Sequence, residues 1–224
     1  MSQLGTFTFE GPAGPIEALY KAGPAEPVRA AVLSHPHPQF GGTMHNKVVF
    51  RAAKAFERLG YPSLRFNFRG VGRSAGTFDG GVGEADDVRA ALDWMAREHP
   101  TLPLVHCGFS FGNAIGTPVA AAHPRVDVLV CLGTPTRSST RGIPFERLAR
   151  ATQPKLFVHG ENDEHGPIDE LRAGFAIVAE PKRLVVVRGA DHFFAGHLEE
   201  LERAIVDHLS DSGFVPSPAE SSPT

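Results

Sequence analysis

Apolar residues along the chain recur at two spacings, and the two kinds of segment alternate. Short apolar runs of strand length predict eight strands, over residues 6–9, 16–20, 30–34, 63–66, 104–108, 126–132, 155–159 and 183–187. Apolar residues three and four positions apart predict helices over residues 47–59, 85–97, 113–122, 169–178 and 198–209. This alternation is typical of an α/β fold: a mostly parallel eight-stranded sheet with helices on both faces, preceded by an antiparallel pair of strands.

Composition favours one large domain. The chain has 224 residues, of which 42% are hydrophobic and 21% charged, and this is enough for a full hydrophobic core. We expect a single domain over residues 1–211. The segment 212–224 is rich in serine and proline, so we expect it to be a disordered tail.

Charge and hydropathy narrow the classes of partner. The net charge is −3 and the arginines are scattered, which gives little support for nucleic-acid binding. No apolar run approaches the roughly 18 residues of a membrane span, and the N-terminus lacks the pattern of a signal peptide. We therefore expect a cytoplasmic protein that acts on a small molecule, with its oligomeric state left open. Cys107 and Cys131 are expected to be buried thiols without a disulfide.

The segment GFSFG, residues 108–112, lies between a predicted strand and a predicted helix. It matches the pattern G-x-S-x-G, whose serine lies on a sharp turn from a strand into a helix. Glycines flank the serine because side chains there would collide with neighbouring backbone. We interpret Ser110 as the nucleophile, held in a strained conformation with its hydroxyl exposed. The alternative is a serine that only caps the following helix.

A serine hydroxyl is a weak nucleophile at neutral pH, so it requires a base, and the base requires an orienting carboxylate. His192 lies in the turn after the last predicted strand, and Asp163 follows the strand before it. In this kind of fold the residues come in the order serine, acid, histidine. We interpret His192 as the base and Asp163 as the acid. Residues that remain open as alternatives lie close by: Glu161, Glu164 and Asp191 for the acid, and His197 for the base.

Two histidines alternate with prolines in SHPHPQFGG, residues 34–42, directly after a predicted buried strand. Histidines at this spacing can bind a metal, but the sequence assigns no further ligands, so we predict neither a metal nor another cofactor. We expect a hydrogen-bonded structural role for His35. In the glycine-rich turn NFRGVGRSAG, residues 67–76, the spacing G-x-G-x-x-G is missing, so we expect Arg69 to pair with a carboxylate rather than a phosphate.

The segments HPHPQFGGTMHNKVV, LRFNFRGVGRSAGTFD, GFSFG, HGENDE and GADHFF together resemble the α/β-hydrolase superfamily, and more closely its small, lidless bacterial serine hydrolases described as carboxylesterases. The resemblance extends from residue 7 to about residue 209. It implies a triad of Ser110, Asp163 and His192 that hydrolyses small carboxylic esters through an acyl-enzyme. Thioesterase, peptidase or acyltransferase chemistry on the same triad is the alternative, and a non-enzymatic binding protein is a more distant one.

The resemblance also implies an oxyanion hole, in which two backbone N–H groups stabilise the negative oxygen of the reacting acyl group. One donor would be Phe111, the residue after the nucleophile. Pro36 and Pro38 have no N–H, which leaves His37 and Gln39 as candidates for the other donor. Alignment with the loop of the family favours His37.

Two expectations concern the shape of the site. Phe40 and Phe194 lie in turns at the predicted site, and we expect them to form an apolar pocket for the acyl group. Many hydrolases of this kind carry a lid between the strands that here end near residue 132 and begin near residue 155. This interval has room for a loop and one short helix, so we expect an open site with minimal or no lid.

Overall fold

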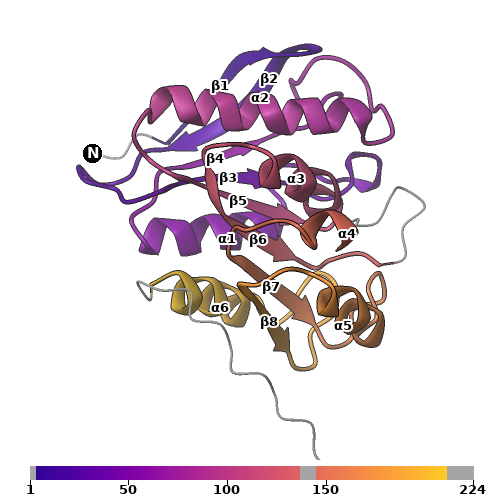
Figure 1. Cartoon of the computed structure of the whole chain (residues 1–224). Coiled ribbons are helices and arrows are strands. Elements are labelled where there is room, and N and C mark those ends of the chain that lie inside the picture. The colour runs from indigo at the N-terminus through magenta and orange to yellow at the C-terminus, as the bar shows by residue number, and fades with distance from the viewer. Residues whose placement is uncertain (1–3, 137–144, 211–224) are drawn as a thin grey trace, which may run out of the picture.

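The computed structural model describes residues 4–136 and 145–210. A single sheet forms its centre, with the strand order β1-β2-β4-β3-β5-β6-β7-β8 (Figure 1). β2 is antiparallel to both of its neighbours, β1 and β4, and the other five pairs of neighbours are parallel. The strands are β1 (Leu4–Gly11), β2 (Gly14–Lys21), β3 (Ala30–Ser34), β4 (Ser63–Phe66), β5 (Leu104–Phe109), β6 (Val126–Leu132), β7 (Lys155–Gly160) and β8 (Lys182–Val187). The predicted fold class is confirmed.

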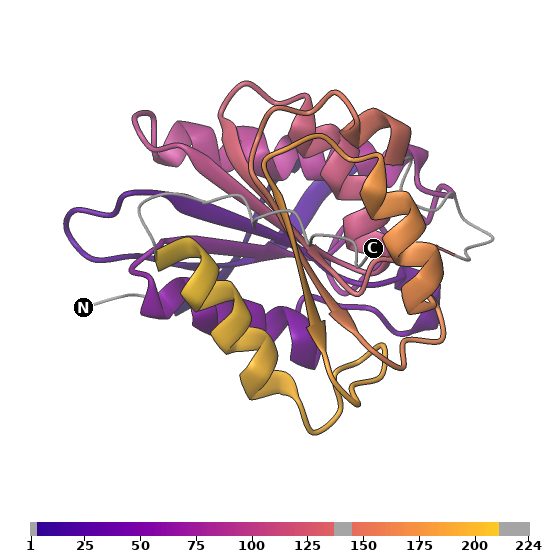
Figure 2. The same cartoon turned by 60° about the horizontal axis from the view of Figure 1, so that its bottom comes forward.

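Helices connect the strands and cover both faces of the sheet. They are α1 (Lys47–Arg58), α2 (Val82–Glu98), α3 (Phe111–Ala121), α4 (Phe145–Leu148), α5 (Ile168–Ala176) and α6 (Leu198–Ser210), with a short 3₁₀ turn, η1 (Pro38–Phe40). α1 and α6 pack on one face, and α2 to α5 pack on the other (Figure 2). Two hydrophobic cores result, one on each side of the sheet.

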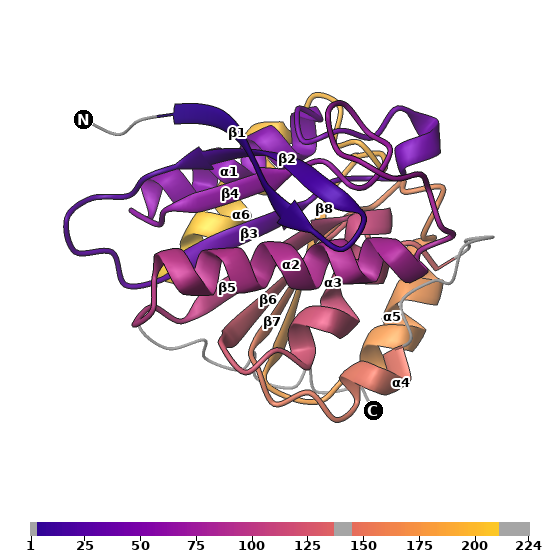
Figure 3. The ribbon, with the colours of Figure 1, turned by 90° about the horizontal axis from the view of Figure 1, so that it is seen from above.

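This double cover explains why the inner strands are continuous apolar runs. Every position of β3, β4, β5 and β7 is buried, because both faces of a parallel sheet are shielded by helices. At the edge of the sheet, α2 lies beside β1 (Figure 3). Trp94 of α2 packs on the rings of Phe7 and Phe9 in β1, with centroids 5.0 and 5.9 Å away.

Helix boundaries differ from the predictions by a few residues. α2 begins at Val82 rather than Ala85, because the Glu84 carboxylate accepts a hydrogen bond from the N–H of Gly81 (2.7 Å) and closes the first turn. α3 begins at Phe111 rather than Asn113, directly after the turn at Ser110.

Three other predictions concern the whole chain. α4 is the short helix expected before β7, but residues 137–144, on which part of the lid prediction falls, lie outside the described residues, as does the predicted tail. None of the helices in the described ranges is long and apolar enough to cross a membrane. Cys107 and Cys131 are buried and unpaired as predicted, and burial raises the pKa of both thiols.

Candidate active site

Ser110 lies on a sharp turn between β5 and α3. Its backbone has φ 54° and ψ −116°, a region that residues other than glycine rarely adopt. The flanking glycines permit the turn: a Cβ at Gly108 would lie 2.5 Å from the Cα of Asn113, and one at Gly112 would lie 2.4 Å from the Ser34 carbonyl oxygen. The strained turn predicted from the pattern G-x-S-x-G is therefore present.

Three residues on three loops form one line of hydrogen bonds. His192 Nδ1 lies 2.8 Å from Asp163 Oδ2, and His192 Nε2 lies 2.9 Å from Ser110 Oγ. A carboxylate only accepts, so Nδ1 carries the ring hydrogen and Nε2 accepts from the Ser110 hydroxyl. His192 and Asp163 are buried, whereas Ser110 is half-buried. The residues predicted as nucleophile, base and acid thus lie within hydrogen-bond distance in that order.

The loops that carry Asp163 and His192 pack on each other. A Cβ at Gly160 would lie 2.5 Å from the Asp191 carbonyl oxygen, and Asn162 N donates to the Ala190 carbonyl (2.9 Å). The two side chains are therefore held at a fixed separation by the backbone of β7 and β8, two neighbouring strands.

Asp163 is stabilised as a carboxylate. Its Oδ1 accepts hydrogen bonds from the backbone N–H groups of His165 (2.8 Å) and Gly166 (3.0 Å). Burial acts to raise the pKa of Asp163, but the hydrogen bonds from His192 and His165 and the nearby histidines outweigh it and hold the pKa below its ordinary value. Asp163 is thus charged near neutral pH and can orient the imidazole of His192.

Among the described residues, no hydrogen bond joins an alternative acid to the His192 ring. Glu161 Oε2 accepts from the N–H of Gly189 (2.8 Å), and Asp191 Oδ1 accepts from the N–H of Ala195 (2.9 Å) within its own turn. Glu164 is exposed and lies 3.6 Å from the ring of His165. His197, the other histidine near the last helix, pairs with Glu200 of α6. Each of these side chains therefore either supports a loop or lies at the exposed surface.

A second buried histidine contacts the same carboxylate, and the sequence analysis did not single it out. His159, at the end of β7, has Nε2 3.6 Å from Asp163 Oδ2 and 2.6 Å from the Gly166 carbonyl oxygen. Its Nδ1 accepts from the N–H of Thr134 (3.2 Å). Because Nδ1 accepts, Nε2 carries the hydrogen, and burial lowers the pKa of His159, so the ring is neutral.

A chain of buried side chains continues from His159 to the helix that follows the nucleophile. Asn113 Nδ2 donates to Thr134 Oγ1 (2.9 Å), and Thr117 Oγ1 donates to Asn113 Oδ1 (2.7 Å). His159, Asn113, Thr117 and Thr134 are fully buried. The network ties the loop of Asp163 to the first turns of α3. The sequence HGEND contains one signal for this network, a histidine near the end of a buried strand, but its partners lie far apart in the chain.

The first histidine of SHPHPQFGG has the structural role that we expected. The His35 ring is buried, its Nε2 accepts from the N–H of Phe68 (3.0 Å), and its Nδ1 donates to the Pro36 carbonyl (2.6 Å). Burial lowers the pKa of His35 to about 4, so the ring is neutral near pH 7. Within the described residues no group of three or more histidine, cysteine or acidic side chains is placed to hold a metal ion.

The second histidine lies beside the nucleophile turn. The His37 ring packs on Phe111 (4.8 Å between centroids), and its Nδ1 accepts from the N–H of Gln39 (3.2 Å). This hydrogen bond uses the Gln39 N–H, whereas none of the hydrogen bonds among the described residues uses the backbone N–H of His37 or Phe111. Of the two candidates, His37 is the one with a donor free for a ligand.

The two phenylalanines predicted to line an acyl pocket have different surroundings. Phe40 is 85% exposed and packs on the His37 ring at 4.7 Å. Phe194 is fully buried in the core with α6, at a backbone φ of 54°. A side chain in the core cannot line an open pocket, so the prediction for Phe194 was wrong. The apolar side chain of Phe194 packs in this core and so holds the loop that carries His192.

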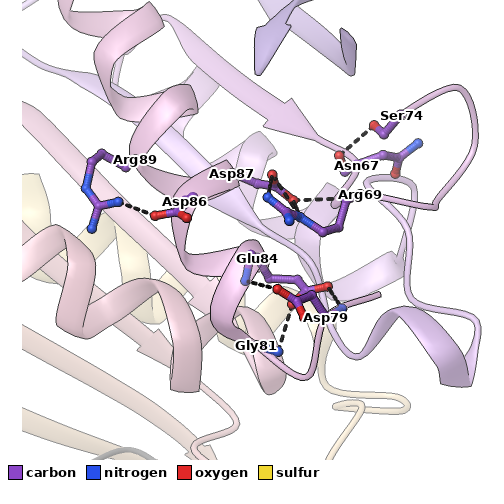
Figure 4. Close-up of polar contacts among 10 residues, drawn as sticks. Asn67, Arg69, Ser74, Asp79, Gly81, Glu84, Asp86, Asp87 and Arg89 are labelled. Carbon is purple, nitrogen blue, oxygen red and sulfur yellow. Dashed lines mark hydrogen bonds and ion pairs between the residues drawn. The ribbon is translucent and has the colours of Figure 1, made fainter. Parts of the chain in front are cut away.

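The glycine-rich turn after β4 is braced by an ion pair. The guanidinium of Arg69 donates to both carboxylate oxygens of Asp87 at 2.8 to 3.2 Å, and the Arg69 backbone N–H donates to the same carboxylate (Figure 4). Ser74 Oγ donates to the Asn67 carbonyl across the turn (2.7 Å). Arg69 is therefore paired with a carboxylate as predicted, which fixes the turn against the first half of α2.

Comparison with known proteins shows the family to which the chain belongs. A family profile described as serine aminopeptidase, S33, matches residues 26–157. An uncharacterized protein of Rickettsia prowazekii is 35% identical over 207 residues, which cover 90% of this chain and 87% of that protein. Fold, site and sequence together define the class as α/β serine hydrolases. The chain belongs to the serine hydrolase family that this profile describes.

Two solved structures are similar over nearly the whole chain. An α/β serine hydrolase homologue from Coxiella burnetii is 37% identical, with a TM-score of 0.84, and covers 92% of this chain and 97% of its own. A member of the α/β serine hydrolases without a lid, from Xanthomonas campestris, is 32% identical, with a TM-score of 0.81, and covers 96% and 97%. The resemblance to lidless serine hydrolases is confirmed.

Proposed function

We propose that the protein hydrolyses small carboxylic esters through an acyl-enzyme formed on Ser110. The observation that carries this proposal is the line of hydrogen bonds from Ser110 through His192 to Asp163. In this proposal Ser110 is the nucleophile, His192 the general base and Asp163 the group that orients and stabilises the imidazolium.

In the first step, His192 Nε2 removes the hydroxyl proton while Ser110 Oγ attacks the ester carbonyl carbon. The carbonyl oxygen becomes negative and accepts hydrogen bonds from the backbone N–H groups of His37 and Phe111. Both donors lie on rigid backbone, beside prolines in one case and at the start of α3 in the other, so they need not reorganise as the charge develops.

His192 then gives the proton to the alcohol oxygen as the ester C–O bond breaks, which completes the acyl-enzyme. Water attacks the acyl-enzyme with His192 again as base, and His192 returns this proton to Ser110 Oγ as the acyl C–O bond breaks and the carboxylic acid leaves. Phe40, exposed beside the His37 ring, offers an apolar surface for the acyl group in this scheme. An alcohol is a better leaving group than an amine in this scheme, which is the chemical reason for placing esters first.

A test compares Ser110→Ala with Ser210→Ala, a change at an exposed serine in the last turn of α6. With p-nitrophenyl acetate, Ser110→Ala should lower kcat by about 10⁴-fold or more, while Ser210→Ala keeps the wild-type rate. Circular dichroism should show the same fold in both variants. Wild-type turnover in Ser110→Ala would exclude this residue as the nucleophile.

Aminopeptidase activity is a second candidate, because the matched family profile is described as serine aminopeptidase. The same three residues would act, with an amine in place of the alcohol as leaving group. A panel of short esters, acyl-CoA thioesters and aminoacyl p-nitroanilides separates the activities. Our proposal requires the largest kcat/KM to fall among the esters.

A further inference from the structure

Two exposed aromatic rings border His192, and neither has a role in the proposed chemistry. The Phe193 ring is 48% exposed and meets the His192 ring edge to face, with centroids 5.2 Å apart. The His165 side chain is 52% exposed, and its ring centroid lies 4.4 Å from that of His192. The base is therefore flanked by two rings that are themselves exposed.

The exposure of Phe193 contrasts with the packing of its neighbour. Phe194 is fully buried and anchors the turn in the core, whereas Phe193 rests on the buried Phe109 ring (5.9 Å between centroids) and presents much of its own ring to solvent. A single exposed phenylalanine is ordinary. Among the large apolar side chains that are exposed in residues 4–136 and 145–210, Phe193 is the one whose ring contacts the candidate base.

The direction of the proposed reaction decides which part of an ester would meet these rings, and here the inference rests on the proposed function. The carbonyl oxygen faces the N–H groups of His37 and Phe111. His192 Nε2 must reach the alcohol oxygen in order to protonate it. The alcohol part of the ester therefore lies on the side of His192, where Phe193 and His165 are exposed.

We propose that Phe193 and His165 form a binding site for the alcohol part of the substrate, and that this site selects esters of uncharged aromatic alcohols. Aromatic rings attract one another in edge-to-face and offset arrangements, beyond the gain from burying apolar area. Glu164, whose carboxylate lies 3.6 Å from the His165 ring, disfavours an anionic alcohol part at the same place.

Three esters separate the alcohol side from the acyl side. Ethyl acetate is the reference, benzyl acetate carries a ring on the alcohol, and ethyl phenylacetate carries a ring on the acyl group. Benzyl and ethyl alcohol are of similar acidity, so the comparison isolates the ring. For Phe193→Ala, kcat/KM for benzyl acetate should fall about threefold to tenfold more than for ethyl acetate. Ethyl phenylacetate should change no more than ethyl acetate.

Three variants complete the design. Phe193→Leu fills the space over Phe109 without a ring and should show the same selective loss, while Phe193→Tyr keeps the ring and should retain the wild-type preference. Phe50→Ala is the matched control, because Phe50 is exposed on α1, packed under the Arg65 guanidinium, and outside the site. It should leave all three substrates unchanged.

The outcomes are distinguishable. An equal loss on all three esters in Phe193→Ala would mean that Phe193 only supports His192, and would overturn the binding site. An unchanged preference for benzyl acetate would overturn it as well. If the wild-type protein hydrolysed none of the three esters, the proposed function would fail, and the binding site with it.

Discussion

His159 and His192 contact the same oxygen of one carboxylate: the His159 Nε2 lies 3.6 Å from Asp163 Oδ2, and the His192 Nδ1 lies 2.8 Å from it. The two histidines differ in environment. His159 is buried and neutral, with hydrogen bonds from Thr134 and to Gly166, whereas His192 reaches the half-buried Ser110. His159 thus fixes the loop of Asp163 without competing for its charge.

Replacement of His159 should therefore lower the rate without changing substrate affinity. His159→Leu leaves the Gly166 carbonyl and the Thr134 N–H unpaired in the core and frees the loop of Asp163, and a small misplacement at a site of this kind costs about 100-fold in rate. We expect kcat for p-nitrophenyl acetate to fall with KM nearly unchanged. His159→Gln retains a donor and should recover part of the rate. A wild-type kcat in His159→Leu would contradict this role.

Asp163 should be the acid on which the rate depends. Asp163→Asn keeps the size of the side chain but holds the wrong tautomer of His192, and the expected loss of kcat is on the order of 10⁴-fold. Glu161→Gln and Asp191→Asn are matched controls, because each retains the oxygen that accepts its backbone hydrogen bond. A large loss in either control, with Asp163→Asn active, would move the acid role to that residue.

His37 should act through its backbone N–H rather than through its ring. The ring packs on Phe111 and accepts the Gln39 N–H, so His37→Ala removes local packing but keeps the donor. We expect a loss of kcat of about tenfold or less, against several orders of magnitude for His192→Ala. Steady-state kinetics of the two variants with one ester decide the point. Equal losses would assign a catalytic role to the His37 imidazole.

Motifs whose residues are adjacent in the sequence could be interpreted most directly. The pattern GFSFG predicts both the strained backbone of Ser110 and the close approach of the glycines, because such a sharp turn from strand to helix brings neighbouring backbone close to both glycines. The inner strands were found for a related reason: they are buried on both faces and appear as unbroken apolar runs.

Contacts between distant segments that no motif marks could not be predicted. The network from His159 through Thr134 to Asn113 joins β7, the loop after β6 and α3, and no spacing in the sequence connects them. Phe193 and Phe194 are identical neighbours, yet one is exposed and one is in the core. The backbone path of this turn, which depends on tertiary packing, decides which of the two side chains is buried.

The free energy of unfolding should decrease as the pH is lowered below neutral, before the carboxylates become protonated. Burial lowers the pKa of His35 to about 4 and that of His106 to about 3, from an ordinary value of 6.5. Both folded-state values lie below the unfolded value, so the stabilisation is present above pH 6.5. It is lost as the pH falls toward 4, because only the unfolded chain then takes up protons. Each histidine contributes about 1.4 kcal/mol per pH unit in that interval.

Urea unfolding across this pH interval measures the effect. The free energy of unfolding should decrease steadily as the pH is lowered, and His106→Leu should show a shallower decrease than the wild type, whatever its stability at neutral pH. The His106 ring is fully buried and contacts Ser34 Oγ at 3.1 Å, so its loss removes one titrating group from the core. Equal slopes in the two proteins would contradict the assignment to His106.

The central claim is that Ser110 is a nucleophile activated by His192, and covalent labelling tests it most directly. The wild-type protein should react with a fluorophosphonate and gain the mass of one phosphonyl group, which peptide mapping should place on Ser110. His192→Ala should react far more slowly, while His37→Ala should still be labelled. Absence of labelling in the wild-type protein, or a label on another serine, would contradict the account.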